Sequence, residues 1–236
     1  MFEVRDIAFA YAGRPVLRGV SFVVSPGETV AVVGANGSGK TTLLKILATL
    51  AQPESGSILV DGQDALALPM RYRRQLGYMP ESPALYDDMT VKSYLRFRAQ
   101  LKGEPEKRIR RRVGESVEMC QLAPYLRRQI RSLSAGLKKR VALADAMLLR
   151  PRVLLLDDFL AGLDRDLRMS SGSIISNIAA FAGVIVTGHE IADMAKWTTR
   201  FLVLRDGVIS STIDAAGIDK ALLTARVDAA LSGGAS

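Results

Sequence analysis

The residues best suited to chemistry form one short loop early in the chain. Residues 34–41 read Gly-Ala-Asn-Gly-Ser-Gly-Lys-Thr, which matches the phosphate-binding pattern G-x-x-x-x-G-K-S/T. Glycines allow a tight turn in which successive main-chain N–H groups point at one anion, and the following helix adds the positive end of its dipole. In this pattern Lys40 contacts the β- and γ-phosphates of a nucleotide, and the Thr41 hydroxyl binds Mg²⁺. The residues expected to bind the nucleotide are Gly34, Asn36, Gly37, Ser38, Gly39, Lys40, Thr41 and Thr42.

A glycine-rich turn that binds nothing is the alternative interpretation of this loop. The sequence around it disfavours that alternative, because an apolar stretch precedes the loop at 29–33 and a helical stretch follows it at 40–50. A strand before the loop and a helix after it are the context that the phosphate-binding pattern requires.

A second chemical feature is a pair of carboxylates, Asp157 and Asp158, directly after the apolar residues 153–156. A parallel strand that ends in a carboxylate places it at the mouth of the sheet, beside the phosphate loop. We therefore expect Asp157 to lie on the metal side, directly or through water. Asp158 is then the expected general base for a water molecule. Taken alone, the pair would more simply be two solvated acids that end a strand.

These residues need an α/β framework to position them. Apolar and alternating patterns predict strands over 2–11, 16–24, 29–33, 57–60, 76–79, 153–156, 184–187, 201–204 and 208–213. Helical patterns cover 40–50, 166–181, 191–197 and 215–231. The stretch 91–149 is helical and basic without an obvious strand, which predicts a helical subdomain inserted at about 82–150. The predicted fold is a P-loop NTPase core with an antiparallel β subdomain and this insert over 1–214, followed by a C-terminal helix and frayed tail over 215–236.

Composition narrows the possible functions. The 236 residues include one Cys and one His, which excludes a disulfide framework, a Cys-based zinc site and a His-rich metal cluster. The net charge is +8, and residues 96–152 hold sixteen basic against five acidic residues. Such a concentration points to an anionic partner or to a solvated helical face. Aromatic residues make up 6% and do not interleave with the basic run, so no nucleic-acid partner is expected.

The sequence also bears on location. No apolar run approaches the ~20 residues of a membrane-spanning helix, and the N-terminus lacks the build of a signal peptide. A reducing, cytoplasmic compartment is the expectation. Cys120 is expected to be a core thiol and Trp197 a packing residue. A solvated helix face, or alternatively a membrane-facing one, is expected for Arg108, Arg110, Arg111 and Arg112.

From Tyr11 to Ile213 the sequence resembles the ATP-binding cassette (ABC) ATPases. Residues 133–137, Leu-Ser-Ala-Gly-Leu, resemble the family's LSGGQ signature, and 138–144 continue it in a typical way. Gly162-Leu163-Asp164 resembles the loop after the second carboxylate motif. His189 resembles the switch histidine, Tyr11 the aromatic residue that stacks on adenine, and Glu81 the usual Q-loop glutamine.

The resemblance implies a mechanism and partners. Two cassettes pair head to tail, and each ATP, with Mg²⁺, lies between the phosphate loop of one chain and the Ser134–Gly136 segment of the other. Asp158, His189 and Glu81 are the implied catalytic residues, while Thr41, Glu81 and Asp157 are implied on the metal side. The second cassette is either an identical chain or a different one. The implied role is an ATPase subunit that drives a transmembrane permease on another chain, peripheral to the cytoplasmic face of the membrane.

Three departures from the family pattern affect this expectation. Asp158 replaces the catalytic glutamate and is one methylene shorter, so we expect slow hydrolysis, since a displacement of ~1 Å can cost ~10²-fold in rate. The signature contains Ala135 and Leu137 in place of Gly and Gln. Glu81 resembles the residue of cassettes that serve ABC-2-type exporters. The alternatives are an ATP-dependent clamp that hydrolyses slowly or not at all, and a soluble single-cassette assembly ATPase.

Overall fold

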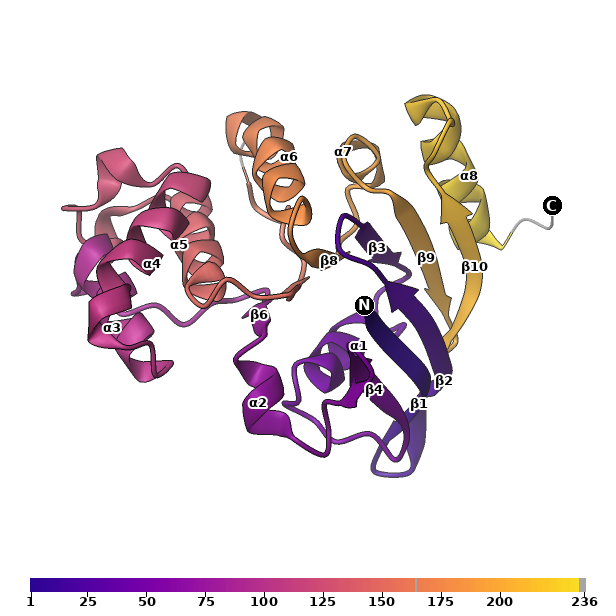
Figure 1. Ribbon diagram of the computed structural model, residues 1–236. Helices are drawn as coiled ribbons and strands as arrows, with labels where there is room; N and C mark the ends of the chain where they lie inside the picture. Colours follow the sequence, from indigo (N-terminus) through magenta and orange to yellow (C-terminus); the bar gives the residue numbers. More distant parts are fainter. Residues whose placement is uncertain (164, 234–236) are drawn as a thin grey trace.

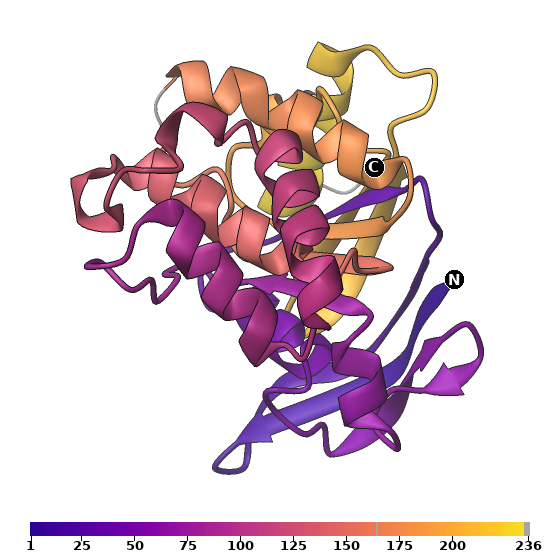
Figure 2. The same ribbon diagram turned by 60° about the vertical axis from the view of Figure 1, so that its left-hand side comes forward.

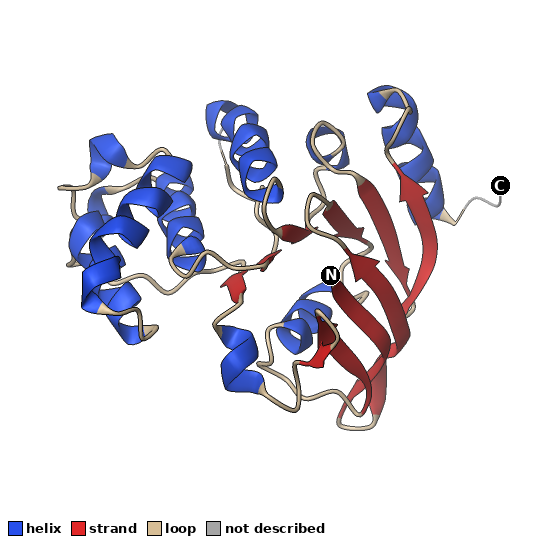
Figure 3. Ribbon diagram, viewed as in Figure 1, coloured by secondary structure: helices blue, strands red, loops and turns tan. Residues whose placement is uncertain are grey.

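The computed structural model describes residues 1–163 and 165–233, and its main element is a six-stranded sheet (Figures 1 and 3). The strand order is β10-β9-β3-β8-β7-β6, and the neighbouring pairs from β9 to β6 run parallel. Every residue of the strands β3, β7 and β8 is buried, as expected for a parallel sheet covered on both faces. The bounds are β3 Thr29–Val33, β6 Leu76–Met79, β7 Val153–Leu156, β8 Gly183–Thr187, β9 Arg200–Arg205 and β10 Val208–Asp214.

A second sheet is antiparallel and has the order β2-β1-β4-β5, with bounds β1 Phe2–Tyr11, β2 Arg14–Val24, β4 Ser55–Val60 and β5 Gln63–Asp64. Helix α1 (Lys40–Leu47) lies between the two sheets. Its buried Leu43 and Leu47 share one apolar core with Phe2 of β1 and with Val30 of β3. Ala31, the next residue of β3, points to the opposite core, so side chains alternate across the sheet.

The segment between β6 and β7 is helical and contains α3 (Val91–Leu101), α4 (Glu106–Met119), two short 3₁₀ turns and α5 (Ala135–Met147). These helices form a lobe beside the six-stranded sheet, with α5 nearest the sheet (Figures 1 and 2). Hydroxyl side chains cap two of them, since Thr90 accepts from the Ser93 N–H and Ser134 from the Leu137 N–H. The helical pattern predicted for 91–149 is confirmed, while the domain limits at 82–150 and 214 stay a prediction.

The rest of the chain covers the other face of the sheet with α6 (Arg165–Ala179), α7 (Ile191–Met194) and α8 (Lys220–Ser232). The prediction that the last helix begins at 215 is wrong, because Asp219 caps α8 by accepting from two N–H groups of its first turn. The predicted helix over 40–50 also ends earlier, and Thr49 beyond it has a positive φ of 55°. The tail 234–236, predicted to fray, lies outside the described residues.

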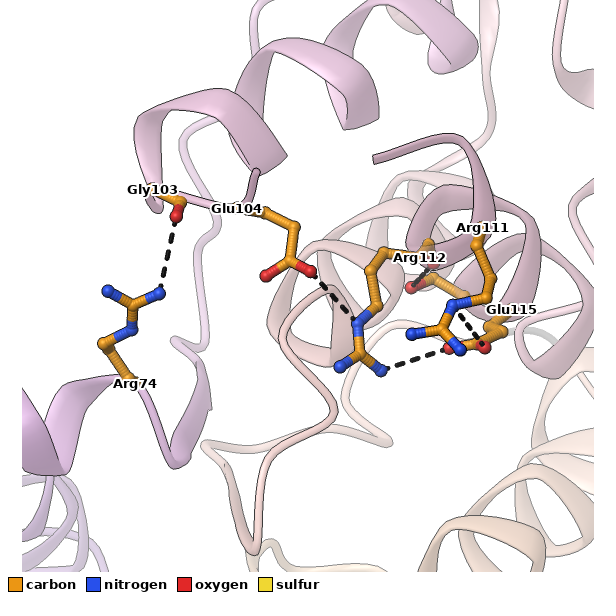
Figure 4. Close-up of polar contacts among 7 residues, drawn as sticks. Arg74, Gly103, Glu104, Arg111, Arg112 and Glu115 are labelled. Atoms are coloured by element: carbon orange, nitrogen blue, oxygen red, sulfur yellow. Dashed lines mark hydrogen bonds and ion pairs between the residues drawn. The ribbon is translucent and has the colours of Figure 1, made fainter. Parts of the chain in front are cut away.

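Polar contacts tie the helical lobe together and to the core (Figure 4). Arg74 follows the short helix α2 (Pro69–Arg73), which the sequence patterns did not predict, and donates to the Gly103 carbonyl at 3.4 Å. Arg112 was expected on a solvated face, yet it packs against the buried Glu104 carboxylate, with Nε 3.4 Å from Oε1. Arg108, Arg110 and Arg111 are exposed as expected.

Three smaller expectations can be compared with the structure. Cys120 is fully buried, and burial raises the pKa of its thiol to about 12, so it is a core thiol as predicted. Trp197 packs over Gly172 of α6, where an added Cβ would lie 2.8 Å from the indole ring. Within residues 1–163 and 165–233, no helix has both the length and the apolar character that crossing a membrane requires.

Candidate functional site

A cavity of about 380 Å³ opens where the strands β3, β7 and β8 end. This is the edge of a parallel sheet at which α/β proteins bind ligands, and the volume lies within the range of about 300–1,000 Å³ typical of ligand sites. Eleven of the residues predicted from the sequence line it, from segments far apart in the chain. They are Tyr11, Asn36, Gly37, Gly39, Lys40, Thr41, Thr42, Glu81, Asp157, Asp158 and His189.

The phosphate loop is held in shape by close backbone packing. Gly39 has a φ of 105°, in the left-handed region, and an added Cβ would lie 2.9 Å from a methyl carbon of Leu17. The Lys40 ammonium is largely buried at the centre of the loop and donates to the carbonyls of Gly34 at 2.7 Å and Ala35 at 3.0 Å. Burial lowers the pKa of Lys40, against the opposing effect of the nearby carboxylates. The loop therefore presents a largely desolvated cation whose hydrogen bonds to the described residues go to neutral carbonyls.

The first turn of α1 places main-chain N–H donors beside the Lys40 ammonium. The first helical bond that follows the loop runs from the Leu43 N–H to the Gly39 carbonyl at 2.8 Å. The N–H groups of Lys40, Thr41 and Thr42 precede that bond, and in the part of the chain that the structure describes they donate to no main-chain carbonyl. Such a helix N-terminus, with a lysine beside it, favours a phosphate.

Asp157 is the buried anchor of the carboxylate pair. Its Oδ1 accepts from the Thr41 hydroxyl at 3.2 Å and from the Thr187 hydroxyl at 2.8 Å. Burial raises the pKa of Asp157, and the two hydroxyl hydrogen bonds oppose that rise by stabilising the carboxylate. Thr187 in turn accepts from the Asp158 N–H at 2.9 Å, so one threonine fixes both members of the pair.

Asp158 differs from its neighbour in having no partner for its carboxylate oxygen. Its Oδ1 is buried and makes no hydrogen bond to any described residue. Its φ is 46°, in the left-handed region that Asp and Asn tolerate better than other residues with side chains. Burial raises the pKa of Asp158, as does the neighbouring Glu190 carboxylate, while His189 and Lys139 lower it. Asp158 is thus a partly buried carboxylate with a raised pKa and one buried oxygen free of hydrogen bonds to the described residues, as expected of a general base.

The remaining predicted residues form the rim of the cavity. Tyr11 is half exposed at the end of β1, and its ring meets that of Phe9 edge to face at a centroid distance of 4.7 Å. Glu81 and His189 are exposed and approach the cavity from the segments after β6 and β8. Sequence reasoning missed three lining residues, Val16, Thr187 and Gly188. Of these, Thr187 had a partial signal, because it is the last residue of the strand predicted over 184–187, although its pairing with the strand before Asp157 was not predicted.

Four predicted residues lie elsewhere. Gly34 sits behind the loop, where an added Cβ would come within 2.3 Å of the Leu204 carbonyl oxygen, and Ser38 lines a neighbouring cavity. Ser134 and Gly136 begin α5 and do not line the Lys40 cavity. Ser134 is exposed, and its oxygen accepts from Leu137, so its own proton stays available to an anion. Asp164, named for its resemblance to a family motif, lies outside the described residues.

The donor set suits magnesium held together with a nucleotide. Thr41 Oγ1 and Asp157 Oδ1 lie 3.2 Å apart and offer one hydroxyl and one carboxylate. Mg²⁺ prefers one or two carboxylates together with substrate phosphates and water, in place of an all-protein cage. Consistent with this preference, the described residues contain no group of three or more His, Cys, Asp or Glu side chains able to hold a metal ion.

Comparisons with known proteins identify the family. The model of the family described as ABC transporter matches residues 17–161. The chain is 31% identical over 210 residues to the "Uncharacterized ABC transporter ATP-binding protein YxlF" of Bacillus subtilis (strain 168) and covers 70% of it. It is 32% identical over 211 residues to the "Spermidine/putrescine import ATP-binding protein PotA" of Mycoplasma capricolum subsp. capricolum and covers 60% of it. Each alignment takes in 89% of this chain.

A solved structure described as "Structure of ATP binding subunit of ABC transporter" superimposes with a TM-score of 0.83 at 29% identity. The match covers 97% of this chain and 99% of that one. The chain therefore belongs to the ABC transporter family and is an ATP-binding cassette of that family, and the predicted P-loop NTPase fold is confirmed.

Proposed function

We propose that this chain is the ATP-hydrolysing subunit of an ABC transporter, which dimerises around ATP and drives a separate membrane subunit. One observation carries the proposal. Lys40, Asp157 and Asp158 line one cavity, whereas the signature residue Ser134 lies outside it on an exposed helix end. A cassette with that division has a phosphate loop and a base but lacks the signature donors, which a second cassette would supply.

The cavity suggests how ATP binds. The adenine stacks on the exposed ring of Tyr11 beside Val16, and the phosphates follow the loop to the first turn of α1. Lys40 exchanges its two carbonyl acceptors for phosphate oxygens, which compensate its burial better because they are charged. Thr41 and Asp157 would hold a magnesium ion, which neutralises charge on the β- and γ-phosphates when bound.

Hydrolysis in this proposal uses one water molecule. Asp158 accepts a proton from the water as its oxygen forms a bond to the γ-phosphorus and the bond to the ADP oxygen breaks, giving ADP and phosphate. His189 and Glu81 lie on the same rim, and we assign them to the γ-phosphate and to the water respectively. The Ser134 hydroxyl and the α5 N-terminus of the partner cassette donate to the γ-phosphate from the opposite side.

A slow rate is part of the proposal. Asp158 is one methylene shorter than the family's glutamate, and its backbone is held at a φ of 46°. Since a misplacement of a catalytic group by ~1 Å can lower the rate by ~10²-fold, turnover well below that of an Asp158→Glu variant is expected.

The same residue supports a second candidate function, a clamp that closes on ATP and barely hydrolyses it. Equal turnover of wild type and Asp158→Glu would contradict both the slow rate and the clamp.

Dimerisation is tested with the hydrolysis-deficient variant Asp158→Asn. We expect this variant to be monomeric without nucleotide and dimeric with Mg-ATP, measured by size-exclusion chromatography with light scattering. The Lys40→Ala, Asp158→Asn double variant serves as the control and should stay monomeric. A protein that stays monomeric with saturating Mg-ATP would refute pairing of identical chains and leave a heterodimer to be sought.

The membrane partner is tested by purification from native membranes. We expect the tagged chain to bring down an integral membrane protein and to be found at the cytoplasmic face, in a position peripheral to the bilayer. The identity of Glu81 favours an exporter of the ABC-2 type as that partner. A chain that copurifies only with soluble proteins would instead support the single-cassette assembly ATPase.

A further inference from the structure

Lys139 of α5 reaches into the turn that carries Asp158. Its ammonium donates to three main-chain carbonyls of that turn, those of Asp158 at 2.8 Å, Phe159 at 3.3 Å and Ala161 at 2.6 Å. A lysine ammonium has three N–H donors, and here each has an acceptor. The turn leaves β7 toward α6, and α5 belongs to the helical lobe, so one side chain joins two parts of the molecule.

The turn at residues 158–161 needs these hydrogen bonds because the backbone conformation of Asp158 is energetically unfavourable. Asp158 has a positive φ, and a residue with a side chain in that region persists only where its surroundings hold it. Phe159 and Leu160 are buried and anchor the turn from below. The Lys139 ammonium donates to three carbonyls of the turn, and the Thr187 hydroxyl accepts from the Asp158 N–H.

Lys139 also faces the charges of the site. Burial lowers the pKa of Lys139, and the nearby carboxylates of Asp158, Glu190, Glu81 and Asp157 oppose that shift. Conversely, Lys139 and His189 lower the pKa of Asp158, whereas Glu190 and Glu81 raise it. The preceding residue, Lys138, points away and pairs with the exposed Asp87 at 2.9 Å. The two adjacent lysines thus have different surroundings.

The position of Lys139 on α5 connects the Asp158 turn to Ser134 at the start of the same helix. Ser134 is the N-cap of the same helix, five residues earlier, so the two lie about 7.5 Å apart along one rigid axis at ~1.5 Å per residue. Because a helix is rigid along its axis, a shift of the exposed Ser134 end would reach the Asp158 turn through the Lys139 ammonium.

We propose that Lys139 is a positioning residue that fixes the Asp158 turn to the signature helix, so that the base acting on one nucleotide is set by the helix that contacts the other. This inference rests on the proposed ATP hydrolysis. It assigns no contact between Lys139 and ATP. Lys139 acts through its hydrogen bonds to the three carbonyls.

The test compares Lys139→Met and Lys139→Arg with the matched control Lys138→Met, using the full chain. We expect Lys139→Met to lower kcat by roughly 10- to 100-fold, since small displacements of a catalytic group cost this much. Its ATP dissociation constant should stay within about twofold of wild type, because the phosphate loop is untouched. Lys138→Met should leave kcat, KM and ATP affinity unchanged.

The split between kcat and ATP affinity separates positioning from simple stability. Loss of positioning lowers kcat and leaves the ATP dissociation constant and the melting temperature near those of wild type, whereas a destabilised fold lowers the melting temperature and weakens ATP binding. Lys139→Arg keeps a cation at this place, but its planar fork cannot meet all three carbonyls, so its kcat should lie between those of wild type and Lys139→Met. Wild-type kcat in both variants would contradict the role, and Lys139→Arg decides it if Lys139→Met does not fold.

A double variant tests the link to the signature helix. If α5 links Ser134 to the position of Asp158, the two substitutions disturb the same feature. The fold-decrease in kcat of the Ser134→Ala, Lys139→Met double variant should then be smaller than the product of the fold-decreases of the two single variants. Strictly multiplicative effects would refute the link. An inactive wild type would overturn the proposed function itself, whereas an active wild type with an equally active Lys139→Met would overturn only the role of Lys139.

Discussion

The cavity end of the sheet and the exposed start of α5 are built in opposite ways. The buried Lys40 ammonium donates to the carbonyls of Gly34 and Ala35. The buried Asp157 carboxylate accepts from the hydroxyls of Thr41 and Thr187. At Ser134 a single capping hydrogen bond of 3.3 Å holds a hydroxyl that is open to solvent. In the first region the side chains of Lys40 and Asp157 already have partners, although Asp158 Oδ1 has none among the described residues. The second region presents a hydroxyl proton that no described residue accepts.

This difference explains how one sequence supplies two unlike halves of a site. Most buried polar groups are satisfied by the fold itself, so the side chains of Lys40 and Asp157 are held in place before any ligand binds. An exposed helix N-terminus costs little to leave open to water, so it can be kept for a partner. The comparison predicts that mutations at the cavity act on nucleotide binding and chemistry, whereas mutations at the α5 tip act on pairing.

The largest effect is expected for Asp158→Asn. The amide cannot accept a proton from water, so turnover should fall by ~10² to 10⁴-fold, the usual contribution of a general base. ATP affinity should be retained, because Asn tolerates the positive φ and the loop is unchanged. A phosphate-release assay and a binding titration check this pair of results. Retained turnover would mean that the base is another residue.

Lys40→Ala should break nucleotide binding at the cavity end. A hydrogen bond to a charged group is worth ~1.5–3 kcal/mol, so the ATP dissociation constant should rise by roughly 10- to 100-fold. Calorimetric titration of the variant with Mg-ATP measures it, and Lys45→Ala on the same helix provides a control outside the cavity lining. Unchanged ATP affinity would argue against the phosphate-loop assignment.

Ser134→Ala tests the exposed start of α5, the second of the two regions compared. We expect weaker ATP-dependent dimerisation, by about tenfold, with the ATP affinity of the monomer unchanged. The loss of the N-cap also destabilises α5 by ~1 kcal/mol, so Thr90→Ala, which removes the N-cap of α3, is the matched control. If both variants weaken the dimer equally, the effect is one of stability and Ser134 has no role in pairing.

The smallest effect expected concerns stability and pH. The pKa of Asp158 is raised in the folded protein, so between its ordinary value near 4 and the raised value the folded state binds more protons than the unfolded state. Stability from this group is therefore present at low pH and lost as pH rises through the folded pKa. Asp158→Asn should melt at the same temperature as wild type below pH 4 and a few degrees higher at pH 7.5, by scanning calorimetry. A lower melting temperature at pH 7.5 would contradict the pKa direction.

Sequence patterns predicted the fold and most of the cavity, and their failures have physical causes. Lys40, Thr41 and Asp157 were found because their spacing and the preceding apolar strands fix them locally. Thr187 was missed because its role depends on the parallel pairing of β7 with β8, thirty residues apart. The contact of Lys139 with the Asp158 turn could not be predicted either, because helical periodicity does not indicate which loop a long side chain contacts.

Boundaries were less predictable than elements. The strands over 76–79 and 153–156 agree residue for residue, because the first ends at Pro80 and the second, a buried apolar run, ends at Asp157. Helix ends moved where a cap decided them, as at Asp219. Arg112 was misplaced because periodicity alone did not reveal that Glu104, on the preceding connection, would bury its charge.

The helix α1, wedged between the two sheets, sets a fixed gauge for the ligand. Tyr11 ends β1 and Lys40 begins α1, and Phe2 of β1 shares one apolar core with Leu43 and Leu47 of α1. The separation between the Tyr11 ring and the Lys40 ammonium at the two sides of the cavity is therefore set by the core, and a ligand that contacts both must match it in length.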